Sequence, residues 1–188
     1  MTDRHDGTNM RILAISGSLR AGSSNTAVLI AAGRLAPPDC QIVLYDGLGG
    51  LPHFNPDLDT ASPPGQVLAL RKQVGSCQGI LLCSPEYAGG VAGALKNALD
   101  WLVGSVEFPG KPVALINASS RAVFADAHLR KTLETMSGRL VEAASITLPL
   151  PPSGIDADGI VANGLLSDQL RMALACFADA IEESRPPG

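Results

Sequence analysis

The sequence predicts an α/β fold in which five parallel strands form one doubly wound sheet, in the order 2-1-3-4-5, with helices on both faces. Apolar runs of strand length alternate along the chain with helical repeats of apolar residues. This alternation is typical of a parallel sheet that is buried on both sides. The two loops richest in ligand-type residues follow the first and third runs, which this strand order places together at its switch point. We therefore expect a ligand site between those loops.

The chain has 188 residues, of which 46% are hydrophobic and 17% charged. These values predict one folded domain, at residues 11–183, with a disordered tail at 1–10 and a frayed tail at 184–188. A net charge of −4 gives no electrostatic reason to expect nucleic acid or an anionic membrane as a partner. The N-terminal segment has no apolar core of the signal-peptide type, and no apolar run approaches membrane-spanning length. A cytoplasmic protein is expected.

Strands are expected at residues 11–16, 41–45, 79–83, 111–117 and within 139–148. Ser62, followed by proline, is expected to cap the helix before the third strand, and Gly138 to end the helix after the fourth. The segment at 46–61 has too many glycines and prolines for regular structure, which predicts a lid or an interface. A further loop is expected at residues 149–159, before the last helix.

The loop after the first strand, GSLRAGSSNT at residues 17–26, has the composition of a phosphate site. Gly17 and Gly22 free the backbone, the hydroxyl and amide side chains supply donors, and the following helix directs unpaired amides to the same place. Arg20 adds a charged partner. A P-loop is excluded because Ser23 stands where its lysine is required, and the glycine fingerprint of dinucleotide sites is absent. The alternative interpretation is an ordinary strand-to-helix turn capped by serine.

The third strand leads into PEYAGG at residues 85–90 and then into a helix expected from Val91 to Val103. Together, GSLR with SN, and PEY followed by LKNALDW, resemble the signature of the NAD(P)H-dependent FMN reductase family. This family includes quinone, chromate and azo reductases of flavodoxin-like fold. The resemblance runs from about Arg11 to about Met136 and includes the segment LPHFNPDLD.

The resemblance implies FMN as the cofactor, NADPH or NADH as the hydride donor, and a quinone, free flavin or similar small molecule as the electron acceptor. The first loop would hold the FMN phosphate and the PEY loop would line the isoalloxazine ring, with Ser119 beside it. No catalytic protein residue and no metal are expected, because the flavin carries the chemistry. The implied cofactor site consists of Ser18, Leu19, Arg20, Ser24, Asn25, Thr26, Pro85, Glu86, Tyr87, Ala88, Gly89 and Ser119.

The chain departs from the family pattern in two places. Ala88 and Gly89 stand where relatives often have asparagine and another polar residue, and Arg121 and Val123 lie where relatives are often rich in glycine. A homodimer or homotetramer is expected, with the apolar helix at 91–103 in a subunit interface. The open alternatives are a flavodoxin-like carrier of single electrons and a flavin-binding module without nicotinamide-dependent activity.

A cysteine and a histidine could be considered catalytic, but a structural role is favoured for the first and a surface position for the second. Cys83 ends the third strand and could be considered a nucleophile, but no base is evident, so a buried strand thiol is expected. His53 lies in the long loop and is expected to be a surface histidine. The four cysteines show no spacing of the metal-site or disulfide kind and are expected to be buried free thiols.

Overall fold

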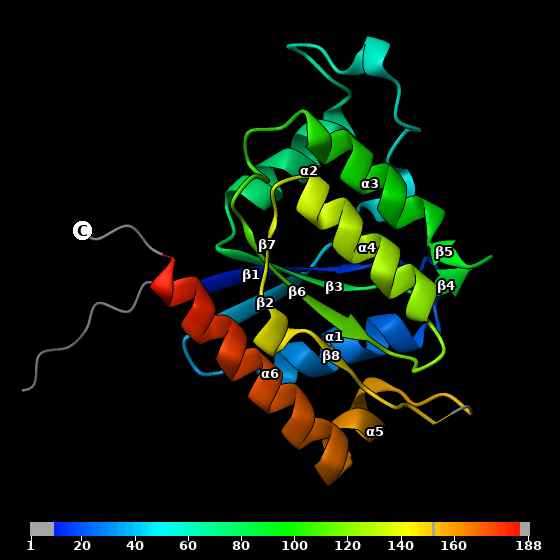
Figure 1. The fold of residues 1–188 in the computed structure, drawn as a ribbon, viewed down its shortest axis with the longest axis vertical. Helices are drawn as coiled ribbons and strands as arrows, with labels where there is room; N and C mark the ends of the chain where they lie inside the picture. Colours follow the sequence, from blue (N-terminus) through cyan, green and yellow to red (C-terminus); the bar gives the residue numbers. More distant parts are fainter. Residues whose placement is uncertain (1–9, 152, 185–188) are drawn as a thin grey trace, which may run out of the picture.

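The computed structural model describes residues 10–151 and 153–184 and shows a sheet between two layers of helices (Figure 1). The strands are β1 (Met10–Ser16), β2 (Cys40–Leu44), β3 (Gly79–Cys83), β4 (Glu86–Tyr87), β5 (Gly90–Val91), β6 (Pro112–Asn117), β7 (Arg139–Leu140) and β8 (Ile146–Thr147). The helices are α1 (Ser24–Leu35), α2 (Gly65–Gly75), α3 (Gly93–Val103), α4 (Val123–Thr135), α5 (Ala157–Ala162) and α6 (Gly164–Glu183). The tails predicted at 1–10 and 184–188 lie outside the described residues, apart from Met10, which begins β1, and Ser184, which caps α6.

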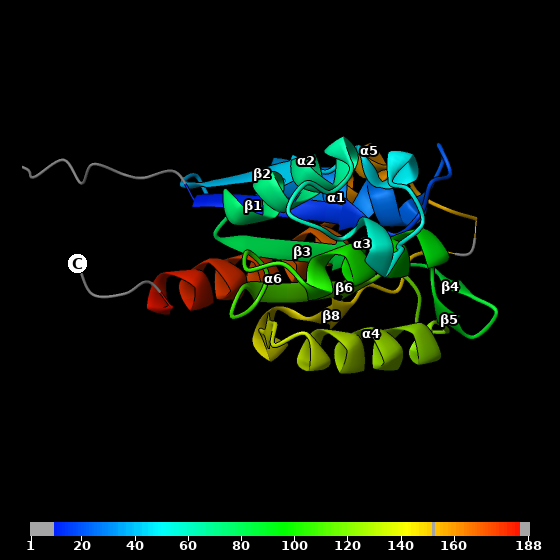
Figure 2. The same ribbon diagram turned by 90° about the horizontal axis from the view of Figure 1, so that it is seen from above.

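The main sheet is parallel and has the order β2-β1-β3-β6-β7. Figure 2 shows β2, β1, β3 and β6 in succession from above. The predicted order 2-1-3-4-5 is therefore confirmed. The fifth position is divided between β7 and β8, which both pair with β6. Between them, the Ser145 hydroxyl accepts a hydrogen bond from Leu115 N (3.1 Å) and donates one to Val141 O (2.9 Å). A side chain thus replaces the backbone ladder, which explains the weak strand pattern of this segment.

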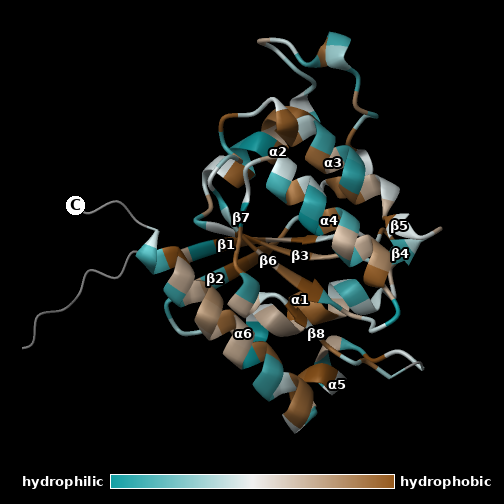
Figure 3. Ribbon diagram, viewed as in Figure 1, coloured by the Kyte–Doolittle hydropathy of each residue, from teal (hydrophilic) through white to brown (hydrophobic). Residues whose placement is uncertain are grey.

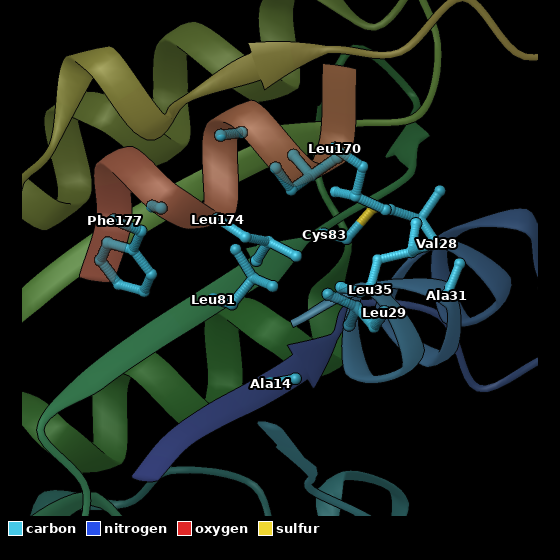
Figure 4. Close-up of a cluster of buried hydrophobic side chains, with 14 of the residues drawn as sticks. Ala14, Val28, Leu29, Ala31, Leu35, Leu81, Cys83, Leu170, Leu174 and Phe177 are labelled. Atoms are coloured by element: carbon cyan, nitrogen blue, oxygen red, sulfur yellow. The ribbon is translucent and has the colours of Figure 1, made fainter. Parts of the chain in front are cut away.

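The two faces of the sheet carry separate apolar cores, because successive side chains of a strand point to opposite faces. In β1, Ile12 and Ala14 face the core beneath α1, α5 and α6, whereas Leu13 and Ile15 face the core beneath α2, α3 and α4. Figure 3 shows the hydrophobic strands between helices with mixed surfaces. Figure 4 shows one of these cores, with side chains of α1 and α6 around those of the central strands. The carboxyl ends of β1, β3 and β6 are therefore rigid platforms for loops.

Two predicted helix starts were wrong. Ser62 does not cap α2, which begins at Gly65 with Pro64 at the N-cap position and without a side-chain cap. A residue before proline is driven into extended backbone, so the Pro63-Pro64 pair delays the helix. Val91 belongs to β5, which pairs antiparallel with β4, and α3 therefore starts two residues later than predicted, at Gly93.

Two further boundaries differ slightly from the prediction. α4 ends at Thr135 with Met136 as its C-cap, and the next residue, Ser137, lies in the left-handed region (φ 59°). Gly138 follows, and its amide donates to Leu133 O (2.9 Å). The loop predicted at 149–159 stops at Asp156, whose carboxylate accepts a hydrogen bond from Gly159 N (2.8 Å) and caps the short helix α5. Among the described helices, none is long and apolar enough to cross a bilayer.

The long segment at residues 46–61 contains two short 3-10 turns and projects beyond α3 (Figure 1). Asn97 of α3 fixes its backbone by accepting from Phe54 N (2.7 Å) and donating to Pro52 O (2.9 Å). The buried Trp101 indole also donates to Pro52 O (2.8 Å) and makes an edge-on ring contact with Phe54. The LKNALDW stretch therefore positions this segment, as well as filling the core.

Candidate functional site

Four segments meet beyond the carboxyl edge of the sheet. They are residues 17–23 after β1, residues 84–92 after β3, residues 118–122 after β6, and residues 148–151 and 153–156 before α5. The first two are neighbours because β1 pairs with β3, which is the switch point of the fold. The predicted meeting of the GSLR and PEY loops is thus present, and the segment before α5, predicted only as a loop, adds a fourth wall.

The contact between the first two loops requires a glycine at position 17. Gly17 N donates to Cys83 O (2.8 Å), which continues the β1–β3 ladder by one residue. A Cβ atom at Gly17 would lie 2.7 Å from Ser84 Oγ and 3.1 Å from Ser84 Cα. Any larger residue would force the two loops apart.

Hydroxyl groups hold the loop after β1 in its shape. Ser23 is the N-cap of α1 and accepts from Thr26 N (3.4 Å), and Thr26 Oγ1 shares a hydrogen bond of 2.8 Å with Ser16 Oγ. The buried Ser18 hydroxyl accepts from Arg20 N (3.3 Å). The serine-capped turn of the alternative interpretation is therefore present, and the same loop carries the exposed Arg20.

The donor set of this loop fits a phosphate monoester. The amides of the first turn of α1, at Ser24 and Asn25, have no acceptor within the helix, and the positive end of the helix dipole lies there. Arg20 is exposed and supplies a charged donor. A dianion is the kind of group that such an arrangement recognises.

Two cavities adjoin at this loop and share Ser24 and Gly154. The smaller, of about 410 Å³, lies between the four segments, and the predicted site residues that line it are Ser24, Asn25, Pro85, Glu86 and Ser119. The larger, of about 650 Å³, flanks the first turns of α1 and includes Arg20, Ser24 and Thr26. The remaining predicted residues, Ser18, Leu19, Tyr87, Ala88 and Gly89, line neither cavity.

The PEY loop is a tight hairpin. Ala88 (φ 50°) and Gly89 (φ 72°) both lie in the left-handed region between β4 and β5, as the two central residues of a type I′ turn do. Asparagine and glycine adopt this backbone at little cost, whereas for alanine it costs about 1–2 kcal/mol, so the departure from asparagine at position 88 leaves the turn strained. Tyr87 before the turn is 56% exposed.

Glu86 has a structural partner that its sequence position did not indicate. Its Oε2 accepts a hydrogen bond from Ala125 N (2.9 Å), in the first turn of α4. The N-cap residue of that helix is Ala122, which has no side-chain acceptor of its own. The carboxylate of Glu86 therefore caps α4 from the neighbouring loop and ties the hairpin to that helix, while Glu86 still lines the smaller cavity.

The loop after β6 is shaped by Asn117, a residue that the sequence analysis did not single out. Asn117 Oδ1 accepts from Ser119 N (3.0 Å), and its Nδ2 donates to Ala122 O (3.2 Å). The Ser119 hydroxyl in turn accepts from Arg121 N (3.3 Å). An asparagine at a strand end, followed by serines, is a signal for such side-chain turns and could have identified it. Other cavity residues missed from the sequence are Ser84, Ala118, Ala122, Leu150, Pro151 and Gly154.

The thiols differ in their surroundings. Cys83 is fully buried, its Sγ donates to Asn25 Oδ1 (3.2 Å), and burial raises the pKa of its thiol. A neutral buried thiol is neither a nucleophile nor a ligand, and the structural interpretation of Cys83 holds. Cys176, by contrast, is exposed on α6, and Cys40 of β2 is only half-buried, so the prediction that all four thiols are buried was wrong for these two residues. His53 is exposed, as expected for a surface histidine.

Comparison with known proteins identifies the family of the chain. The family model of NADPH-dependent FMN reductases matches residues 10–149. An NAD(P)H-dependent FMN reductase of Pseudomonas aeruginosa is 36% identical over 168 residues, which cover 87% of this chain and 88% of the relative. A 2-hydroxy-1,4-benzoquinone reductase of a Burkholderia species is 33% identical over 176 residues, covering 90% and 93% of the two chains.

Among solved structures, a flavoenzyme NAD(P)H:acceptor oxidoreductase of Paracoccus denitrificans has a TM-score of 0.82 to this chain. The two are 29% identical, and the match covers 93% of this chain and 98% of the other. The predicted flavodoxin-like fold, cofactor class and enzyme class are confirmed. The chain belongs to the NADPH-dependent FMN reductase family and is an FMN-dependent NAD(P)H oxidoreductase.

Proposed function

We propose that the loop at residues 17–26 holds the phosphate of FMN and that the cavity of about 410 Å³ holds its ring system. The observation that carries this assignment is the position of Ser24 and Asn25. Both begin α1, where an anion is favoured, and both line the cavity between the loops. One molecule with a phosphate at one end and a flat ring at the other would satisfy both features.

Bound FMN supplies the redox chemistry, accepting a hydride and giving up two electrons. The chain contributes binding and orientation. Pro85 and Glu86 border the cavity on the hairpin side, and Ser119 borders it on the side of the third loop. Glu86 fixes the hairpin to α4, which follows the third loop, so the hairpin wall and the Ser119 wall keep the same position relative to each other. No acid, base or nucleophile from the chain is required.

The electron acceptor is proposed to be a quinone, a free flavin or a similar small molecule that enters the same cavity as the nicotinamide donor. The chain is similar to a 2-hydroxy-1,4-benzoquinone reductase, which supports a quinone. Two molecules that use one cavity in turn give ping-pong kinetics, so we expect parallel lines in double-reciprocal plots.

A cytoplasmic homodimer or homotetramer is also proposed. In support, Val103 at the end of α3 is 61% exposed and Val106 after it is 89% exposed, although the rest of the apolar face of α3 is buried in the chain's own core. Sedimentation at micromolar concentration checks the oligomer, and a stable monomer would contradict it.

The cofactor assignment is tested by fluorescence titration of the cofactor-free protein with FMN. Arg20→Ala should weaken binding by about 1.5–3 kcal/mol, the range for a charged hydrogen bond, which is a factor of about 10–150. The matched control is Arg171→Ala, which removes the same charge from an exposed position on α6. Equal affinities in both variants would remove Arg20 from the phosphate site.

A further inference from the structure

The charged side chains that line the two adjoining cavities can be accounted for one by one. Asp158 forms an ion pair with Arg34, and the Asp156 carboxylate accepts from Gly159 N (2.8 Å). Glu86 is engaged by Ala125 N (2.9 Å). All the carboxylates of these cavities therefore have partners within the chain.

Of the three arginines that line these two cavities, Arg34 is paired with Asp158, whereas Arg20 and Arg121 have no acidic partner among the described residues. Over residues 10–151 and 153–184, neither Arg20 nor Arg121 forms an ion pair. Arg20 lines only the larger cavity, beside the phosphate loop, and Arg121 lines only the smaller one. One anion, the FMN phosphate, accounts for Arg20 under the proposed function. Arg121 lies on a different wall, that of the smaller cavity, and its guanidinium is free to bind a second anion there.

Hydrogen bonds shape the backbone around Arg121, whose side chain is exposed. Arg121 N donates to Ser119 Oγ (3.3 Å), and Ala122 N donates to Ser119 O (3.1 Å). Residue 121 is thus held in a turn between β6 and α4. A guanidinium that projects from a fixed turn is a forked donor suited to a carboxylate, phosphate or enolate. The chain has a net charge of −4, so an unpaired arginine at the cavity gives this place a more positive electrostatic potential than the chain as a whole, which favours an anionic ligand.

We propose that Arg121 is a specificity-determining residue that binds an anionic group on the molecule sharing the cavity with the flavin. The proposal rests on the proposed function. The shared chemistry is a negatively charged group, which has two possible sources. One is a phosphate of the nicotinamide dinucleotide, and the other is the anion of a hydroxylated or carboxylated quinone acceptor. A site selected only for uncharged acceptors would gain nothing from this arginine.

The test compares the FMN-loaded wild type with Arg121→Gln, Arg121→Lys and the control Arg171→Gln. NADP⁺ is titrated against each protein, with the perturbation of flavin absorbance as the signal. The specificity constants kcat/KM are then measured for one carboxylated and one uncharged quinone. If the donor supplies the anion, Arg121→Gln should raise the Kd of NADP⁺ about tenfold or more. If the acceptor supplies it, the ratio of kcat/KM for the charged to the uncharged quinone should fall about tenfold instead.

In either case, Arg121→Lys should keep part of the preference, and Arg171→Gln should match the wild type within about twofold. The proposal is overturned if Arg121→Gln changes neither the NADP⁺ affinity nor the quinone ratio. It is also overturned if Arg121→Gln weakens FMN binding as strongly as Arg20→Ala, because Arg121 would then belong to the cofactor site. Failure of the wild type to bind FMN at all would instead refute the proposed function, and the initial FMN titration reveals this separately.

Discussion

Replacing Gly17 with alanine should disrupt the point at which the two ligand loops meet. The new Cβ would lie 2.7 Å from Ser84 Oγ, which can rotate away, but also 3.1 Å from Ser84 Cα, which belongs to the backbone. Overpacking of this kind costs about 1–3 kcal/mol, and the loss of glycine entropy in the unfolded chain offsets about 0.4–1 kcal/mol. We predict a net decrease of about 1–2 kcal/mol in the free energy of unfolding.

Urea denaturation of the cofactor-free protein measures this change, and Gly22→Ala is the matched control. Gly22 lies in the same loop, and the nearest atom to its added Cβ would be Arg20 Nη2 at 3.8 Å, an ordinary contact. The control should therefore be as stable as the wild type or slightly more stable. If Gly17→Ala and Gly22→Ala unfold at the same urea concentration, the two loops do not meet as closely as described and the reasoning fails.

The remaining predictions concern the hairpin and the thiols. Ala88→Asn should raise the free energy of unfolding by about 0.5–1 kcal/mol, since asparagine tolerates the positive φ at this position; an unchanged denaturation midpoint would count against a strained turn. Glu86→Ala should lower it by about 1 kcal/mol through loss of the α4 cap, and Glu86→Gln, which keeps an acceptor, should lose less than half as much; equal losses would contradict a capping role. Iodoacetamide at pH 8 should alkylate Cys176 and leave Cys83 unmodified, because Cys176 is exposed whereas burial raises the Cys83 pKa; mass spectrometry of the folded protein decides, and rapid labelling of Cys83 would show that the site is open.

The sequence was sufficient to predict the fold and the pairing of the two loops. Strands buried on both faces read as continuous apolar runs, and polar loops at neighbouring strand ends must meet in a parallel sheet. The residues around Ser23 and Arg20 could be identified because a helix cap and a phosphate loop are both formed by residues that are consecutive in the sequence.

Features that depend on distant parts of the chain could not be predicted. Glu86 caps a helix 39 residues away. The wall formed by Leu150 and Pro151 reaches the cavity because β8 pairs with the distant strand β6 and Leu148 N donates to Asn117 O (2.8 Å). The β4–β5 hairpin was missed because its turn has alanine where the recognisable signal is Asn-Gly or Asp-Gly. The late start of α2 reflects Pro64, whose restriction of the residue before it outweighed the capping signal of Ser62.

Anaerobic mixing of the FMN-loaded protein with NADPH, and separately with NADH, tests the assigned chemistry most directly. We predict that the visible absorbance band of the oxidised flavin bleaches within seconds with at least one of the two donors. Later addition of a quinone should restore the band, as expected for a cavity used by donor and acceptor in turn. If neither nicotinamide bleaches the flavin while dithionite does so readily, the protein is a flavin-based carrier of single electrons, and the assignment as a reductase is contradicted.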